Sequence, residues 1–494
     1  MRKNVFLVIF SVLLCAQAHS QEIYRGTTYE YINGAFYTIN YECEILGNFV
    51  VGGTARVEIN CANVKNGQLD IDIPRYINCF ISAGGSNLQA SLPTYVYFRS
   101  GNCEITTIKI GQNYSGDFYE MFGWGTANRL DGLANLTSIE VAEGNLTYSS
   151  EDGILYNRNK TSLLCYPAKK IGDNFVIPGT VTKIDSYAFE NCINLTSVNI
   201  PSSVTNIHDF AFQLHPNLIS IEVAEGNKNY SSENGVLYNS DKTALRHYPQ
   251  GKLDKNFIIP AMVKDVWIMR SPNLISITIP PSVSYLSNNF SGYGCPNLTS
   301  IEVLAGNKNY SSEDGILYNS DKTTLLCYPA SKTGESFVIP ETVTIIGNGA
   351  FMYCANLTSL YIPESVTAIR FGAIESCAKL TSIINLNPVP LNIADLETFK
   401  YVDKSACTLY VPVGSKENYQ NARVWKDFKN IVELPANNEN PCQELEENTD
   451  PNYTYRYFLW GGKESPTKPA KGVNHYRVTF YKGNPTALDK YKCN

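Results

Sequence analysis

Apolar residues recur along the middle of the chain at fixed positions. In Leu195-Thr-Ser-Val-Asn-Ile-Pro201, apolar side chains occupy the first, fourth and sixth positions, and a proline follows. This pattern predicts a short strand with inward-facing apolar residues that ends at the proline, because proline cannot donate a hydrogen bond to a sheet. Val204, Ile207 and Phe212 follow and predict the opposite wall of the same coil.

The pattern repeats as one long unit followed by two short units. Equivalent apolar residues are separated by 36, 23, 23, 36, 20, 24, 36 and 23 residues. These residues are Val141, Ile177, Ile200, Val223, Ile259, Ile279, Val303, Ile339 and Ile362. A repeat of this kind predicts stacked structural units, and therefore one solenoid over residues 136–386.

The long unit contains an insertion that predicts a hairpin. Its copies lie at 148–167, 230–249 and 310–329, and each has two apolar runs separated by polar turn residues. We expect each insertion to form a β-hairpin that protrudes from one edge of the solenoid.

An asparagine precedes the strand leucine in most units. These residues are Asn194, Asn217, Asn273, Asn297 and Asn356. The position suits a side-chain amide that satisfies backbone groups at the turn between coils. Several of them also form Asn-Leu-Thr, a glycosylation acceptor sequence, but the turn position already explains the asparagine.

The units resemble a known repeat family. Leu-Thr-Ser-Val-x-Ile-Pro-x-Ser-Val-Thr-x-Ile, with Ala-Phe and Cys-x-Asn-Leu, is similar to the BspA-type leucine-rich repeat, and the hairpin unit resembles the longer unit of the same proteins. The resemblance covers residues 136–386. Residues 261–272 and 283–295 lack Ala-Phe, so flattened or partly irregular coils are expected there. The resemblance implies adhesion to host or matrix components in host-associated bacteria.

The segments outside the repeats follow other patterns. Residues 21–135 are β-rich and irregular, which fits either an N-terminal cap with degenerate repeats or a separate binding domain. Residues 387–435 resemble the C-terminal cap of the family: one strand, then a short amphipathic helix in which Trp425, Phe428 and Ile431 cover one apolar end. A polar linker and a β-rich tail are expected in residues 436–494.

The expected fold class is therefore mainly β with few short helices. It is a leucine-rich-repeat solenoid with protruding β-hairpins, a β-rich N-terminal cap and a small C-terminal cap.

The first 20 residues predict a secretory signal peptide. Arg2 and Lys3 precede an apolar run, Val5–Leu14, and small residues follow. Cys15 suggests a lipoprotein, but the residue before a lipidated cysteine is normally small and here it is leucine. No later stretch is long and apolar enough for a transmembrane helix. The mature protein is expected to be exported, and either secreted or held at the cell surface.

Charge and cysteine positions narrow the partners and the chemistry. The formal net charge of −6 becomes −8 without Arg2 and Lys3, which argues against a nucleic-acid partner. Six cysteines share two repeat positions and are expected to be small core residues: Cys165, Cys192, Cys295, Cys327, Cys354 and Cys377. Others could form bridges: Cys43, Cys61, Cys79, Cys103, Cys407, Cys442 and Cys493, with Cys442–Cys493 preferred.

No constellation of catalytic or metal-ligating residues is recognisable. The chain lacks His-Glu-x-x-His, Gly-x-Ser-x-Gly and a phosphate-binding glycine-rich loop. Glu151, Asp152 and Asp241 could suggest calcium, but Asp-Gly is an ordinary turn pair and no oxygen-rich loop surrounds it. We therefore expect no catalytic residue, cofactor or metal.

The outward positions of the repeat strands are the remaining candidate site. Stacking would align them into ladders, in which the expected ligand-facing residues are Glu140, Asn199, Glu222, Thr278, Glu302 and Tyr361. The leading hypothesis is a non-catalytic exported protein that mediates protein–protein or cell-surface adhesion. The alternative is a glycan-binding accessory protein, for which Tyr361 and Trp267 are the candidate aromatic residues. A third hypothesis is an exported enzyme with its catalytic residues in 21–135.

Overall fold

The computed structural model shows a mainly β chain wound as a solenoid of about 12 turns, which confirms the expected fold class. It describes residues 105–112, 114–115, 133–267, 270–287, 290–393 and 395–434 in full, and further strands in 22–98 and 453–491 by their backbone pairing. The chain divides into two compact units, Met1–Tyr230 and Ser231–Asn494. The predicted signal peptide and Cys442–Cys493 bridge lie outside the described residues.

The first unit begins with a five-stranded sheet. Its order is β1 (Glu22–Ile32), β2 (Ala35–Leu46), β3 (Phe49–Ile59), β7 (Ser86–Phe98) and β6 (Tyr76–Ala83). A second sheet contains β4 (Val64–Lys65), β5 (Gln68–Ile71), β8 (Thr107–Ile110) and β9 (Ser138–Val141). Strands β5, β8 and β9 are parallel and in register, so solenoid pairing starts before residue 136.

The repeats of this unit then form two sheets. Each short coil contributes one strand to each sheet, whereas the hairpin unit contributes three strands to the second one. One sheet is parallel and contains β13 (Asn174–Val176), β15 (Ser197–Ile200) and β17 (Ser220–Val223). The other contains β10 (Tyr148–Glu151), β11 (Ile154–Asn157), β12 (Ser162–Cys165), β14 (Lys183–Ile184) and β16 (Asn206–Ile207).

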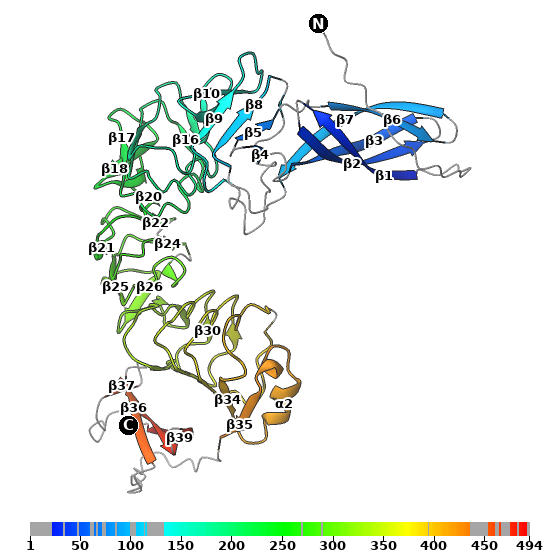
Figure 1. Ribbon diagram of the computed structural model, residues 1–494. Helices are drawn as coiled ribbons and strands as arrows, with labels where there is room; N and C mark the ends of the chain where they lie inside the picture. Colours follow the sequence, from blue (N-terminus) through cyan, green and yellow to red (C-terminus); the bar gives the residue numbers. More distant parts are fainter. Residues whose placement is uncertain are drawn as a thin grey trace. The chain divides into compact units, whose positions relative to one another are not determined.

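The second unit repeats this arrangement twice (Figure 1). Its first two sheets contain β18 (Tyr230–Glu233), β19 (Val236–Asn239), β20 (Ala244–His247), β22 (Asp265–Val266) and β24 (Tyr285–Leu286), and β21 (Asn256–Ile258), β23 (Ser276–Ile279) and β25 (Ser300–Val303). The next two contain β26 (Tyr310–Glu313), β27 (Ile316–Asn319), β28 (Thr324–Cys327), β30 (Ile345–Ile346) and β32 (Ala368–Ile369), and β29 (Ser336–Val338), β31 (Ser359–Ile362), β33 (Ser382–Asn385), β34 (Thr408–Val411) and β35 (Asn430–Glu433).

The predicted hairpins are present and extend one of the sheets. Asp152 and Gly153 both have positive φ, 50° and 73°, as a two-residue hairpin turn requires. Strand β11 pairs antiparallel with both β10 and β12, and β12 continues in parallel to β14. Leu155 and Tyr156 on β11 are buried, so the hairpin belongs to the solenoid core.

Two sets of asparagines join successive coils. The predicted role of the set before the strand leucine is confirmed: Nδ2 of Asn217, for example, donates to the carbonyl of Ile193 at 2.6 Å. A second set, in the turn after the strand, was missed by the sequence analysis: Asn145, Asn227 and Asn307. Nδ2 of Asn145 donates to two carbonyls of the preceding coil at 2.8 Å, and its Oδ1 accepts from two N–H groups, also at 2.8 Å.

The C-terminal cap closes the second unit, with one difference from the expectation. Trp425, Phe428 and Ile431 are buried in the core cluster, but they do not share a helix. The helix is α2 (Lys416–Asn421); Trp425 lies in the 3-10 turn η3 (Trp425–Asp427) and Ile431 lies in β35. Ala422 is extended and ends α2. The three residues therefore reach the core from a turn and a strand, although their spacing in the sequence is that of a helix.

We predict that Asn145→Ala lowers the free energy of unfolding by about 1–3 kcal/mol, because it leaves buried backbone groups without partners. The control is Asn194→Ala, which removes two long hydrogen bonds of 3.3 and 3.2 Å at an exposed turn. Chemical denaturation of both variants measures the difference, and equal losses would contradict the distinction between the two sets.

Candidate ligand-binding surface

The outward positions of the parallel sheet in the first unit form two rows. One row aligns Asn174, Ser197 and Ser220, and the other aligns Val176, Asn199 and Glu222. Asn174 Oδ1 accepts hydrogen bonds from Ser197 Oγ and Asn199 Nδ2, both at 2.8 Å. Ser220 Oγ donates to Glu222 Oε1 at 2.5 Å. Neighbouring side chains therefore hold one another in place on this face.

The second unit repeats the row that carries the glutamate. Ile258, Thr278 and Glu302 align on β21, β23 and β25, in the same order of apolar, polar and acidic residues. The apolar residue is strongly exposed in both copies, since Val176 is 64% and Ile258 is 68% exposed. Both glutamates are exposed as well. The structure thus brings Asn199 together with Glu222, and Thr278 together with Glu302.

Two of the six expected ligand-facing residues lie apart from these rows. Glu140 is on β9, in a different sheet, where it pairs with Lys109 at 3.4 Å. Tyr361 on β31 is only 1% exposed and belongs to an apolar cluster. The expectation that the Tyr361 side chain is exposed is therefore wrong.

The repeat cysteines are unpaired and line the core, as expected. All seven cysteines described in full are free thiols; Cys165 is half-buried and the others are buried, including Cys407. The Sγ of Cys192 donates to Tyr166 O at 3.5 Å, and that of Cys377 donates to Phe351 O at 3.0 Å. Burial raises the pKa of Cys295 to about 11, so its thiol stays protonated and is a poor nucleophile.

A histidine replaces cysteine at one of these positions. His215 stands three residues before the strand leucine, where Cys192 stands in the previous unit. Its ring is fully buried, lies edge-on to Phe189 and Phe212, and has an unpartnered Nε2. Burial lowers the pKa of His215 to about 3, so the ring is neutral and serves the core rather than a catalytic site.

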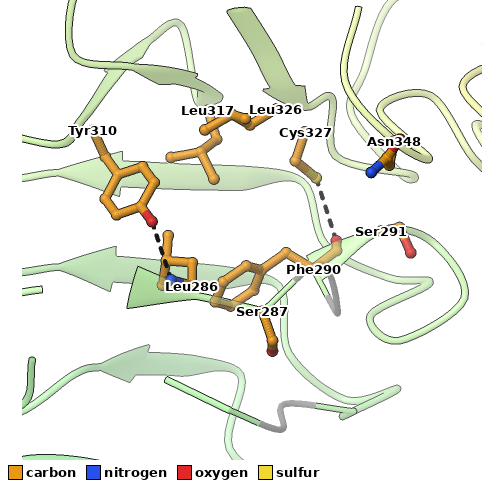
Figure 2. Close-up of a pocket in the computed structure, with 9 residues that line it drawn as sticks. All are labelled: Leu286, Ser287, Phe290, Ser291, Tyr310, Leu317, Leu326, Cys327 and Asn348. Atoms are coloured by element: carbon orange, nitrogen blue, oxygen red, sulfur yellow. Dashed lines mark hydrogen bonds between the residues drawn. The ribbon is translucent and has the colours of Figure 1, made fainter. Parts of the chain in front are cut away.

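A small cavity of about 90 Å³ lies in the second unit, where one coil lacks Ala-Phe. Tyr310 Oη accepts a hydrogen bond from the Leu286 N–H at 3.0 Å, and Cys327 Sγ donates to Phe290 O at 3.3 Å beside it (Figure 2). In a later coil, Phe351 is the phenylalanine of the Ala-Phe pair, whereas the irregular coil has Gly292 at that position. Typical ligand pockets measure about 300–1,000 Å³, so we interpret the cavity as a packing consequence of the irregular coil.

An aromatic and cationic group distinguishes the middle copy of the long cycle. The Arg246 guanidinium lies 5.3 Å from the ring centroid of Trp267, and the Trp267 and Tyr285 rings are 5.2 Å apart. Trp267 is 37% exposed and Tyr285 is 44% exposed. The equivalent positions in the other copies are Leu164 and Leu326, Asp185 and Gly347, and Asn206 and Ala368.

Chemistry-bearing residues do not converge elsewhere in the part of the chain described in full. There, no group of three or more His, Cys, Asp or Glu side chains could hold a metal ion. Within the same residues, no helix is long and apolar enough to cross a membrane.

The stacked strands, inward leucines and asparagine-bridged turns define a leucine-rich-repeat solenoid. Residues 165–244 and 327–406 match the family described as BspA type leucine rich repeat region, in six copies. These two segments are therefore BspA-type leucine-rich repeats. The interval between the two matches contains both departures seen in the sequence, 261–272 and 283–295.

Three solved structures of bacterial proteins have similarity to this chain. A leucine-rich repeat protein from Eubacterium ventriosum shares 23% identity over 58% of this chain and 82% of that one, with a TM-score of 0.39. A leucine rich cell surface protein from Faecalibacterium prausnitzii shares 17% identity over 83% of this chain and 95% of its own, with a TM-score of 0.31. The pneumococcal vaccine antigen PcpA shares 15% identity over 83% of this chain and 99% of its own, with a TM-score of 0.30. No curated protein matches the chain.

The burial of His215 predicts a pH-dependent contribution to stability. Its pKa in the folded state, about 3, is below the ordinary value of 6.5 in the unfolded chain, so only the unfolded chain takes up the proton between these pH values. Its contribution to the free energy of unfolding should therefore fall by about 1.4 kcal/mol per pH unit below pH 6.5. The variant His215→Cys, which restores the residue of the previous coil, should unfold with a shallower pH slope; an unchanged slope between pH 6.5 and 4.5 would contradict this.

Proposed function

We propose that this chain is a non-catalytic, exported binding protein that holds a protein ligand on the outward rows of its strands. The observation that carries the proposal is the repeated order of apolar, polar and acidic residues: Val176, Asn199 and Glu222 in one unit, and Ile258, Thr278 and Glu302 in the other. Each row offers an exposed apolar contact beside a carboxylate. This arrangement suits a protein surface with apolar and basic side chains.

Adhesion to a host or matrix protein is the specific form of this function that we propose. Leucine-rich-repeat solenoids are typically non-catalytic and use their extended surfaces for binding. An exported location follows from the predicted signal peptide. Glu140 carries the same acidic character on β9, next to Lys109.

We predict that Glu140→Ala, Glu222→Ala and Glu302→Ala together weaken binding to immobilised extracellular-matrix proteins by at least about tenfold, because the carboxylates of both rows and the exposed carboxylate of β9 are lost. The matched control replaces Glu143, Glu225 and Glu364, which are exposed in turns after the strands. Surface plasmon resonance at two salt concentrations measures both variants. Equal affinity of the two would remove the strand rows from the proposal.

Glycan binding is the second candidate, and its support lies on the other sheet. Tyr361 is buried, so of the two aromatic residues expected from the sequence only Trp267 is exposed, with Tyr285 and Arg246 beside it. Aromatic faces bind sugars by stacking on their apolar side, and the contact needs an accessible ring.

We expect Trp267→Ala to abolish binding of the full chain on a glycan array if this second function holds, since the ring provides the stacking surface. Leu326→Ala, at the position on β28 that corresponds to Arg246 on β20, is the control for a truncation on the equivalent sheet of the next copy. Glycan binding that persists in Trp267→Ala would exclude this site.

A further inference from the structure

The outward apolar residues on the first four strands of the last sheet in the second unit are buried, whereas Val432 on the fifth strand, β35, is 43% exposed. Val338 on β29 is 2% exposed, whereas Val176 and Ile258 at the same repeat position are 64% and 68% exposed. Each of the three lies on the first strand of its sheet, directly after a phenylalanine. Neither the residue type nor the position in the sheet accounts for this difference.

The buried outward residues form one cluster, which we call the outer strip: Val338, Tyr361, Ile384, Tyr410 and Leu434. The first two residues of the polar row beside it, Ser336 and Ser359, are buried too. Ser336 is 5% exposed, while Asn174 and Asn256 at the same repeat position are exposed. Successive side chains of a strand point to opposite faces, so the residues under the sheet cannot bury this one. A further layer of the chain must lie over the outer strip.

We propose that the C-terminal tail sheet lies over the outer strip. This sheet pairs β37 (Glu464–Ser465), β36 (Tyr453–Leu459), β38 (His475–Tyr481) and β39 (Asn484–Tyr491) in that order. Leu434, where the cap ends, belongs to the outer strip, so the chain leaves the solenoid at this face. The 18 residues from 435 to 452 reach as far as about 60 Å when extended.

The composition of the tail fits this occupant. Positions 453, 455, 457 and 459 of β36 are Tyr, Tyr, Tyr and Leu, an alternation that gives a small sheet one apolar face to bury. Residues 453–494 contain eight Lys and Arg against two Asp and Glu, a net charge of +6, whereas the rest of the chain carries −12. Glu335 and Glu341 flank β29, so two acidic residues lie next to the first strand of this sheet in the sequence.

This contact would withdraw the outer strip from ligand binding and confine the ligand to the exposed rows of the other parallel sheets. It does not depend on the proposed function, because it concerns burial within one chain. It also gives the tail a defined role, as a cover for an apolar face that would otherwise promote association with other molecules.

A cleavable linker tests the proposal in the full-length mature chain. A protease site inserted between residues 436 and 441 leaves Cys442 and Cys493 on the same fragment, and reducing agent removes any disulfide between the fragments. After cleavage, we expect the tail to co-elute with the solenoid in size-exclusion chromatography. Separation of the fragments in the otherwise unchanged chain would overturn the proposal.

Paired variants locate the contact. Ile384→Lys with Tyr410→Lys should weaken retention of the tail by at least about tenfold, because two apolar contacts become charged. Val176→Lys with Ile258→Lys adds the same charge at exposed equivalents and should retain the tail. If the lysine pair impairs folding, Ile384→Ser with Tyr410→Ser tests the same contact. Serine already occupies outward positions of other strands, so the fold should tolerate it. Retention of the tail in both outer-strip variants would overturn the proposal. So would a dimer of the unsubstituted chain that is absent only in these variants, because the outer strip would then contact a second copy of the chain.

Discussion

Every coil of this protein buries its apolar side only by stacking on the coils before and after it. The strands of successive coils pair in parallel and in register, so Leu, Val and Ile at the inward positions form continuous columns. A single coil has too little apolar surface to offset the entropy of ordering its backbone. Repetition, rather than any one residue, is the condition for the fold.

Polar groups inside the stack also depend on the neighbouring coils, because these coils provide their hydrogen-bond partners. Asparagines at two turn positions satisfy backbone groups of the preceding coil, and core thiols donate to its carbonyls. A buried polar group without a partner costs about 1–3 kcal/mol, so these positions admit few residue types. His215 shows what else the cysteine position tolerates: a ring that remains neutral because burial disfavours its charged form.

The surface is less constrained than the core, and its outward side chains differ from one sheet to the next. Two parallel sheets carry exposed rows that end in Glu222 and Glu302, while the last sheet carries the buried outer strip. The group around Trp267 lies on the opposite sheets and occurs in one copy of the cycle. Binding residues are free to vary between coils because the inward positions already provide the stability.

The sequence by itself determined the solenoid, its cycle of long and short units, the hairpin turns and the unpaired core cysteines, because each follows from local spacing that the stacking requires. It also identified the order of Asn199 and Glu222, and of Thr278 and Glu302, on outward positions. It could not determine that Trp425 and Ile431 reach the cap from a turn and a strand, since spacing alone does not separate these from a helix. Nor could it show that Tyr361 is buried while Val176 is exposed. The two residues occupy outward positions in different copies of the cycle, and only the tertiary structure decides which outward face receives a further layer.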